Sequence, residues 1–211
     1  MLAKEKWEFL DLLKSQGKKL YDANLCARCG GECCKTQSCF LLPFDIYPFT
    51  AKKIIYLIDN GFYSIRAFFE KDKAYAFLTA REEKDSKVAI LMPHSSCAHL
   101  TDQGCLFFEQ ERPSGGIALI PKPGLKCEPT LTVEELEDPW KESRVVEVMD
   151  EVLQNYIGNQ SINSYCWSAF RDFENSVLSG TCRYNFFTKY LIYKDGVSFG
   201  YKFKEGFDSK L

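Results

Sequence analysis

Residues 26–39 read CARCGGECCKTQSC and contain five of the ten cysteines of the chain. The spacing is C-x2-C-x3-C-C-x4-C, and the five cysteines are Cys26, Cys29, Cys33, Cys34 and Cys39. Two residues between the first pair let both thiolates face one metal ion while backbone N–H groups point at the sulfurs. The glycines that follow, Gly30 and Gly31, permit the positive φ with which a chain folds back over a metal. The segment therefore predicts a cysteine-rich metal-binding loop.

The adjacent pair Cys33 and Cys34 leaves three interpretations open. Neighbouring side chains diverge, so the two thiolates do not readily close on one tetrahedral ion. They can serve two different ions, one of them can bridge, or one of them is not a ligand.

Three later cysteines, Cys97, Cys105 and Cys127, are expected to complete the site. With the first five they give eight thiols, enough for two four-coordinate sites or for one iron–sulfur cluster and one other site. The two histidines, His94 and His99, flank Cys97. Imidazole is a good zinc ligand, but the cysteines already supply enough ligands, so we expect both histidines to be solvated loop residues.

Other uses of the cysteines fit the sequence less well. The first twenty residues have no unbroken apolar run, so we expect no signal peptide. We therefore expect a cytoplasmic protein whose thiols are reduced. That expectation disfavours a disulfide scaffold, and CARC is not followed by the helix of a thioredoxin-type redox pair. Cys166 and Cys182 lie among aromatic residues and are predicted to be buried core residues rather than ligands.

Length and composition exclude several classes of protein. The chain has 211 residues with 45% hydrophobic residues, which suits one folded domain. A net charge of -2 argues against a protein that binds nucleic acid by neutralising phosphates, and no stretch is apolar enough to span a membrane. We expect a single domain, 1–211, with a metal-binding region at 22–129 and a helical and hairpin part at 130–211.

Hydrophobic periodicity predicts an α+β fold, a small antiparallel sheet flanked by helices. Before residue 130 we expect an amphipathic helix over 4–20 with its lysines facing solvent and a helix capped by Thr50 that ends at Gly61. Strands are expected at 74–80 and 87–92 around a charged loop, with a third at 104–108, and 113–129 is expected to be an irregular loop.

After residue 130, Thr132 and Glu135 predict a capping box. The helix that follows is expected to restart near Pro139 and to end at Gly158. A further helix is expected over 162–178. Residues 190–203 resemble a β-hairpin that turns at Asp195-Gly196.

Three segments resemble the CxxCxxxCC cysteine-cluster family of zinc- or iron-chelating proteins. The first is Cys26-x2-Cys29-Gly-x3-Cys33-Cys34 with Leu42 and Asp45-Ile46 downstream. The second is Cys97-x-x-Leu100 followed by Gly104-Cys105-Leu106-Phe107, and the third is Glu111-Arg112-Pro113. The resemblance covers about residues 22–129, and this combination of spacings is much more specific than a lone CxxC.

The chain departs from the family pattern at Gly116, where the family usually has a cysteine. Cys127 resembles a later family cysteine, so one ligand is missing and Cys39 or a histidine is left to replace it. The resemblance implies a protein that binds zinc or iron, the latter also as an iron–sulfur cluster. Some larger relatives act in lysine N-methylation of flagellin, so an enzyme whose metal site supports a substrate pocket is the alternative. No glycine-rich methyl-donor loop, Ser/His/Asp set, HExxH or P-loop supports that alternative.

Overall fold

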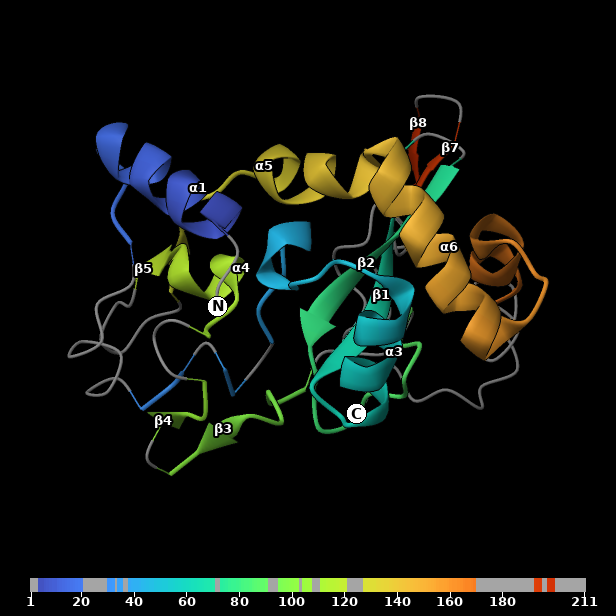
Figure 1. Cartoon of the computed structure of the whole chain (residues 1–211), viewed down its shortest axis with the longest axis horizontal. Helices are drawn as coiled ribbons and strands as arrows, with labels where there is room; N and C mark the ends of the chain where they lie inside the picture. Colours follow the sequence, from blue (N-terminus) through green and yellow to red (C-terminus); the bar gives the residue numbers. More distant parts are fainter. Residues whose placement is uncertain are drawn as a thin grey trace, which may run out of the picture.

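A computed structural model describes residues 4–20, 30–32, 34–35, 38–70, 73–90, 95–102, 104–107, 111–120 and 127–169, and the backbone of two strands at 192–194 and 197–199. Helices alternate along the chain with antiparallel two-stranded sheets, so the predicted α+β class is confirmed (Figure 1). No helix in this part of the chain is long and apolar enough to cross a membrane.

The main hairpin pairs β1 (Tyr63–Glu70) with β2 (Lys73–Ala80). Isolated bridges widen it at both edges, because Phe40 pairs antiparallel with Thr79 and Val88 pairs parallel with Ile65. The prediction of β2 is confirmed. The prediction that residues 87–92 form its hairpin partner is wrong, since β1 takes that place. β1 was not predicted because a charged residue, Arg66, lies in its middle and the sequence between β1 and β2, Lys71-Asp72, contains neither glycine nor proline.

Two helices cover one side of this hairpin. In α3 (Ala51–Asp59), Thr50 accepts a hydrogen bond from the Lys53 N–H, so the predicted cap is confirmed. The second helix, α6 (Ser143–Ile157), packs against α3 and β2 and ends before Gly158 as predicted. The two helices and the hairpin share one large apolar core, in which Ile54, Ile58, Ile65, Leu78, Met149 and Val152 are almost wholly buried.

A second, smaller core lies under the N-terminal helix α1 (Lys4–Ser15), beside the short helix α4 (Ser114–Ile117) (Figure 1). The expectation of an amphipathic helix is confirmed for 4–15, where Leu10 and Leu13 are buried and Trp7 is 39% exposed. The expectation that the lysines face solvent is wrong for Lys6, because its Nζ is buried 3.0 Å from an Asp45 carboxylate oxygen.

Asp45 belongs to the 3-10 turn η1 (Pro43–Asp45), beneath α1. The third strand expected at 104–108 is only the short β4 (Gly104–Cys105), paired with β3 (Leu100–Thr101). The stretch 113–129 is more regular than predicted. It contains α4 and a pair formed by β5 (Leu119–Ile120) and β6 (Glu128–Pro129).

The C-terminal predictions are confirmed as far as the structure describes them. Thr132 and Glu135 cap α5 (Val133–Glu137) reciprocally, and a 3-10 turn, η2 (Asp138–Lys141), lies between α5 and α6. Residues 162–169 are helical, and the rest of the helix expected to 178 lies outside the described residues. β7 (Ile192–Lys194) pairs with β8 (Val197–Phe199), as expected for the hairpin.

Replacing Trp140 by phenylalanine tests the link between η2 and the cysteine-bearing edge of the sheet. The indole is 1% exposed, and its Nε1–H donates to the Leu41 carbonyl at 3.0 Å. The variant loses that hydrogen bond and some packing, so urea denaturation should show a loss of about 1–3 kcal/mol. Trp7→Phe is the matched control and should cost less than about 0.5 kcal/mol at its exposed position. Equal losses in the two variants would contradict this role of Trp140.

Candidate metal centre

The end of β2 anchors two of the predicted cysteine ligands. The Ala80 N–H donates to the Cys39 carbonyl at 3.0 Å, and Cys97 forms an antiparallel bridge with Glu82. Cys39 and Cys97 are 58 positions apart in sequence, yet backbone pairing holds both within three residues of one strand end.

Two further predicted ligands are tied to Cys97. Its N–H donates to the Cys34 carbonyl at 2.7 Å. Cys105 pairs with Leu100 in the β3–β4 ladder, and the Leu100 N–H donates to the Cys97 carbonyl. The structure therefore gathers four of the eight predicted ligands, and they come from three separate segments.

Gly31 lets the turn that carries Cys34 approach β3. Its φ is +74°, and an added Cβ would come 2.5 Å from a Leu100 methyl carbon. Any side chain here would therefore be strained and would also push against β3. The expectation that this glycine permits a tight fold-back is confirmed for the backbone.

The Cys39 thiol lies in the electrostatic field of its neighbours. The residue is only partly exposed, and burial raises the pKa of its thiol well above the usual value. Cys97 and Cys105 raise this pKa further, whereas the Arg112 guanidinium opposes the rise. Cys97, Cys105 and Arg112 are thus close enough to Cys39 to influence the pKa of its thiol. Binding of a metal ion there would have to displace the Cys39 proton.

A buried carboxylate joins the two cysteine-bearing segments. Glu82 is fully buried, and its Oε1 accepts from the Ser38 N–H and hydroxyl, both at 3.0 Å. Its Oε2 accepts from the Ser95 N–H at 2.6 Å and lies 3.3 Å from an Arg66 nitrogen. Ser38 precedes Cys39, and Ser95 is two residues before Cys97. One carboxylate therefore sets the approach of both segments to β2.

A second buried carboxylate, Asp45, holds α1 and α4 to the same region. It accepts from the Ser114 N–H at 2.9 Å and from the Ser114 hydroxyl at 2.8 Å, and it pairs with Lys6. The Lys6 ammonium also donates to the Arg112 carbonyl at 2.6 Å. These contacts fix the backbone of Arg112, whose side chain lies near Cys39.

The expectation that His99 is a solvated loop residue is wrong, because the structure buries it. It is 9% exposed, and its ring lies between Phe62 and Phe107, with centroid distances of 6.0 and 4.6 Å. Its Nε2 is 2.8 Å from the Phe62 carbonyl oxygen, so this nitrogen carries the proton and donates. Burial lowers the pKa of the ring, which therefore favours the neutral form. The geometry gives His99 a packing role with its Nε2 already engaged.

The remaining predicted ligands are placed less completely. Cys127 is half-buried and directly precedes β6. Cys26, Cys29, Cys33 and His94 lie outside the described residues, as does Cys182. Within the described residues, no group of three or more His, Cys, Asp or Glu side chains is arranged to hold a metal ion.

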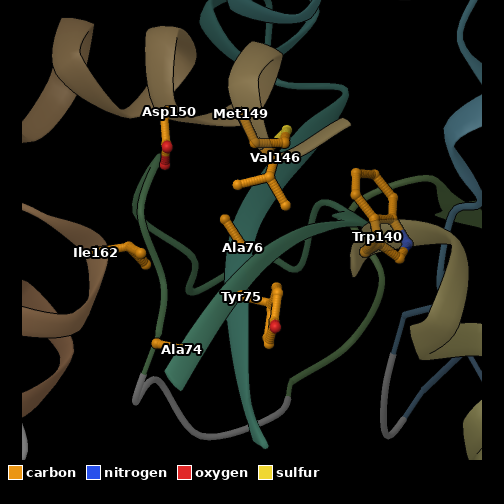
Figure 2. A pocket seen from close by; sticks show the side chains of 8 residues that line it. All are labelled: Ala74, Tyr75, Ala76, Trp140, Val146, Met149, Asp150 and Ile162. Atoms are coloured by element: carbon orange, nitrogen blue, oxygen red, sulfur yellow. The ribbon is translucent and has the colours of Figure 1, made fainter. Parts of the chain in front are cut away.

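A small pocket lies away from the cysteines, between β2, α6 and the start of the helix at 162–169 (Figure 2). It has a volume of about 10 Å³, space for roughly one water molecule. Its lining is mostly apolar and includes Trp140, Met149 and Ile162. Asp150 is the one carboxyl there, and burial raises its pKa. Its polar side chains are those of Tyr75, Trp140 and Asp150, and its size leaves no space for a substrate larger than a water molecule.

Comparison with known proteins gives no match: no family model, no curated protein and no solved structure is significantly similar to this chain.

Glu82 is a residue that sequence reasoning missed as part of this region. Asp45 was named in the family resemblance, but its buried pairing with Lys6 and Ser114 was not predicted. Charged residues are mostly exposed, and nothing in the spacing of Glu82 indicates burial. The local signal is its position two residues after the apolar strand β2, where a polar residue can remain within the core.

Glu82→Gln should destabilise the protein by about 3 kcal/mol, measured by urea denaturation. The amide keeps the shape but loses the charge facing Arg66, and its NH₂ group cannot accept the hydrogen bonds that a carboxylate oxygen accepts. Glu83→Gln is the matched control, because Glu83 is exposed. Glu83→Gln should change the free energy of unfolding by less than about 0.5 kcal/mol. If the two variants unfold alike, the role assigned to Glu82 is wrong.

Proposed function

We propose that this protein binds zinc or iron through its cysteine cluster, the iron either as ions or as an iron–sulfur cluster. One observation carries the proposal: Cys34, Cys39, Cys97 and Cys105 gather at the end of β2 from three segments. Buried structural cysteines have no need to converge in this way, whereas thiolates that share a metal must. The ligand set also includes Cys26, Cys29, Cys33 and Cys127.

The polar scaffold around the cysteines supports the same proposal. Thiolates that share a metal site carry net negative charge, and nearby cations lower its cost. Arg112 acts electrostatically on Cys39 in this sense. Backbone N–H groups in tight turns are the usual donors to metal-bound sulfur, and residues 30–32 and 34–35 lie in turns.

Zinc and iron are distinguished by their spectra. A zinc protein is colourless, whereas an iron–sulfur cluster is brown and loses visible absorbance on reduction. Elemental analysis of protein purified without oxygen gives the metal and its stoichiometry in one measurement.

Cys105→Ser should lower the metal content of anaerobically purified protein, because a hydroxyl is a poor replacement for a thiolate ligand. Cys166→Ser is the matched control. Cys166 is fully buried in an apolar cluster, and burial raises the pKa of its thiol to about 12, so it remains protonated. Its serine variant should keep the full metal stoichiometry while losing about 1–3 kcal/mol of stability. The opposite pattern of metal loss would contradict the division between ligand and core cysteines.

Removal of the metal should lower the melting temperature. Ligands from three separate segments are joined by the metal, so its binding free energy contributes to folding. The experiment compares the melting of fully reduced protein before and after a strong chelator, followed by re-addition of zinc or ferrous iron. An unchanged melting temperature in a sample shown to have lost its metal would exclude a structural metal.

A further inference from the structure

Neighbouring atoms leave little space for a side chain at Gly115 and Gly116 of α4. Neither has a positive φ, so the backbone conformation does not require glycine at either position. Glycine within a helix costs roughly 0.5–1 kcal/mol relative to alanine. Two in succession indicate that something lies too close to the helix for a side chain.

The close neighbours are Cys39 and the residue after it. A Cβ on Gly115 would come 2.5 Å from the Phe40 carbonyl oxygen, which accepts the Gly115 N–H at 3.2 Å. A Cβ on Gly116 would come 3.3 Å from the Cys39 Sγ and 3.4 Å from the Cys39 Cβ. It would also come 3.2 Å from the Arg112 Cγ. The Cys39 side chain therefore lies against the face of α4 where position 116 has no side chain.

Contacts on both sides fix this approach. Backbone pairing with Leu78 and Ala80 holds residues 39–41 to β2. Asp45 holds Ser114, two residues before Gly116. Because these contacts hold both sides, the Cys39 sulfur lies against α4 at position 116.

We propose that Cys39 is a ligand of the metal site and that its sulfur lies where the sulfur of a cysteine at position 116 would lie. This inference rests on the proposed function and adds the position of one ligand. A cysteine at 116 would direct its Cβ toward the present place of the Cys39 sulfur, so its own thiol could serve the same site. The side chains of Cys39 and of a cysteine at 116 would be in direct contact, so the two positions offer a thiol to the same place.

An exchange of the two positions tests the proposal. Cys39→Ser should reduce the zinc or iron content of the anaerobically purified protein to less than about half of the wild-type value, since one thiolate of the set is lost. The double variant Cys39→Ser, Gly116→Cys should restore it to the wild-type value. Cys39→Ser, Asp102→Cys is the matched control. It adds a thiol at an exposed position of the β3–β4 turn and should restore nothing.

The outcomes separate the two proposals. If the wild-type chain contains no metal and takes up neither zinc nor ferrous iron, the proposed function fails and the ligand role fails with it. If the wild-type chain contains metal and Cys39→Ser retains all of it, metal binding stands and Cys39 is not a ligand. If Cys39→Ser loses metal but cysteine at 116 does not restore it, the equivalence of the two positions is wrong.

A second measurement tests the steric part without metal. In reduced, metal-free protein, Gly116→Ala combines the usual stabilisation of a helix by alanine with a new contact to the Cys39 sulfur. The change in melting temperature on Gly116→Ala should therefore be more favourable by about 2 °C or more in a Cys39→Ala background than with Cys39 present, because the sulfur that the new methyl group meets is gone. If the changes in melting temperature caused by Gly116→Ala and Cys39→Ala simply add in the double variant, the inferred packing of Cys39 against position 116 is wrong.

Discussion

The buried Glu82 carboxylate is the contact on which the arrangement of the cysteines depends. It binds the backbone N–H groups of Ser38 and Ser95, which belong to segments far apart in sequence, and its charge is balanced by Arg66. Asp85 shares that arginine at 2.6 Å and also accepts the Glu82 N–H. A buried charge is costly unless it is paired and hydrogen-bonded. The cluster therefore forms as a whole, and it fixes where Cys39 and Cys97 lie relative to β2.

A carboxylate suits this task better than an apolar contact. Apolar packing is non-directional and tolerates shifts of register, whereas a carboxylate that accepts from two backbone N–H groups sets the position of each chain. Arg66 reaches the cluster from the middle of β1, at a position where an apolar residue would be expected. The charged residue that made β1 hard to recognise in the sequence is thus one of the residues that order the cysteine region.

Local signals in the sequence predicted the parts of the fold that local interactions determine. Thr50, Thr132 with Glu135, and Gly158 mark helix ends through contacts within a few residues, and these helix ends were predicted correctly. The pairing of β1 with β2 and the burial of Lys6 were not predicted. Lys6 is buried because Asp45, 39 positions away in sequence, neutralises it, and no periodicity in α1 carries that information. The cysteine spacing predicted a shared metal site, and this stays a prediction: the structure ties the backbones of Cys34, Cys39, Cys97 and Cys105 to one another or to the end of β2, but among the described residues it arranges no three such side chains to hold a metal ion.

The histidine and glycine near these cysteines show why residue type alone did not assign the ligands. His99 has the chemistry of a zinc ligand, but its Nε2 donates to the Phe62 carbonyl and its ring packs between two aromatic side chains. Gly116 has no side chain that could bind a metal, yet the sulfur of Cys39 lies against its position. A thiolate can reach one site from either of two backbone positions when the segments that carry them lie in contact. On the proposed ligand role of Cys39, the cysteine missing at position 116 is not a missing ligand, because the neighbouring segment supplies the thiol and the close approach of Cys39 favours glycine at 116.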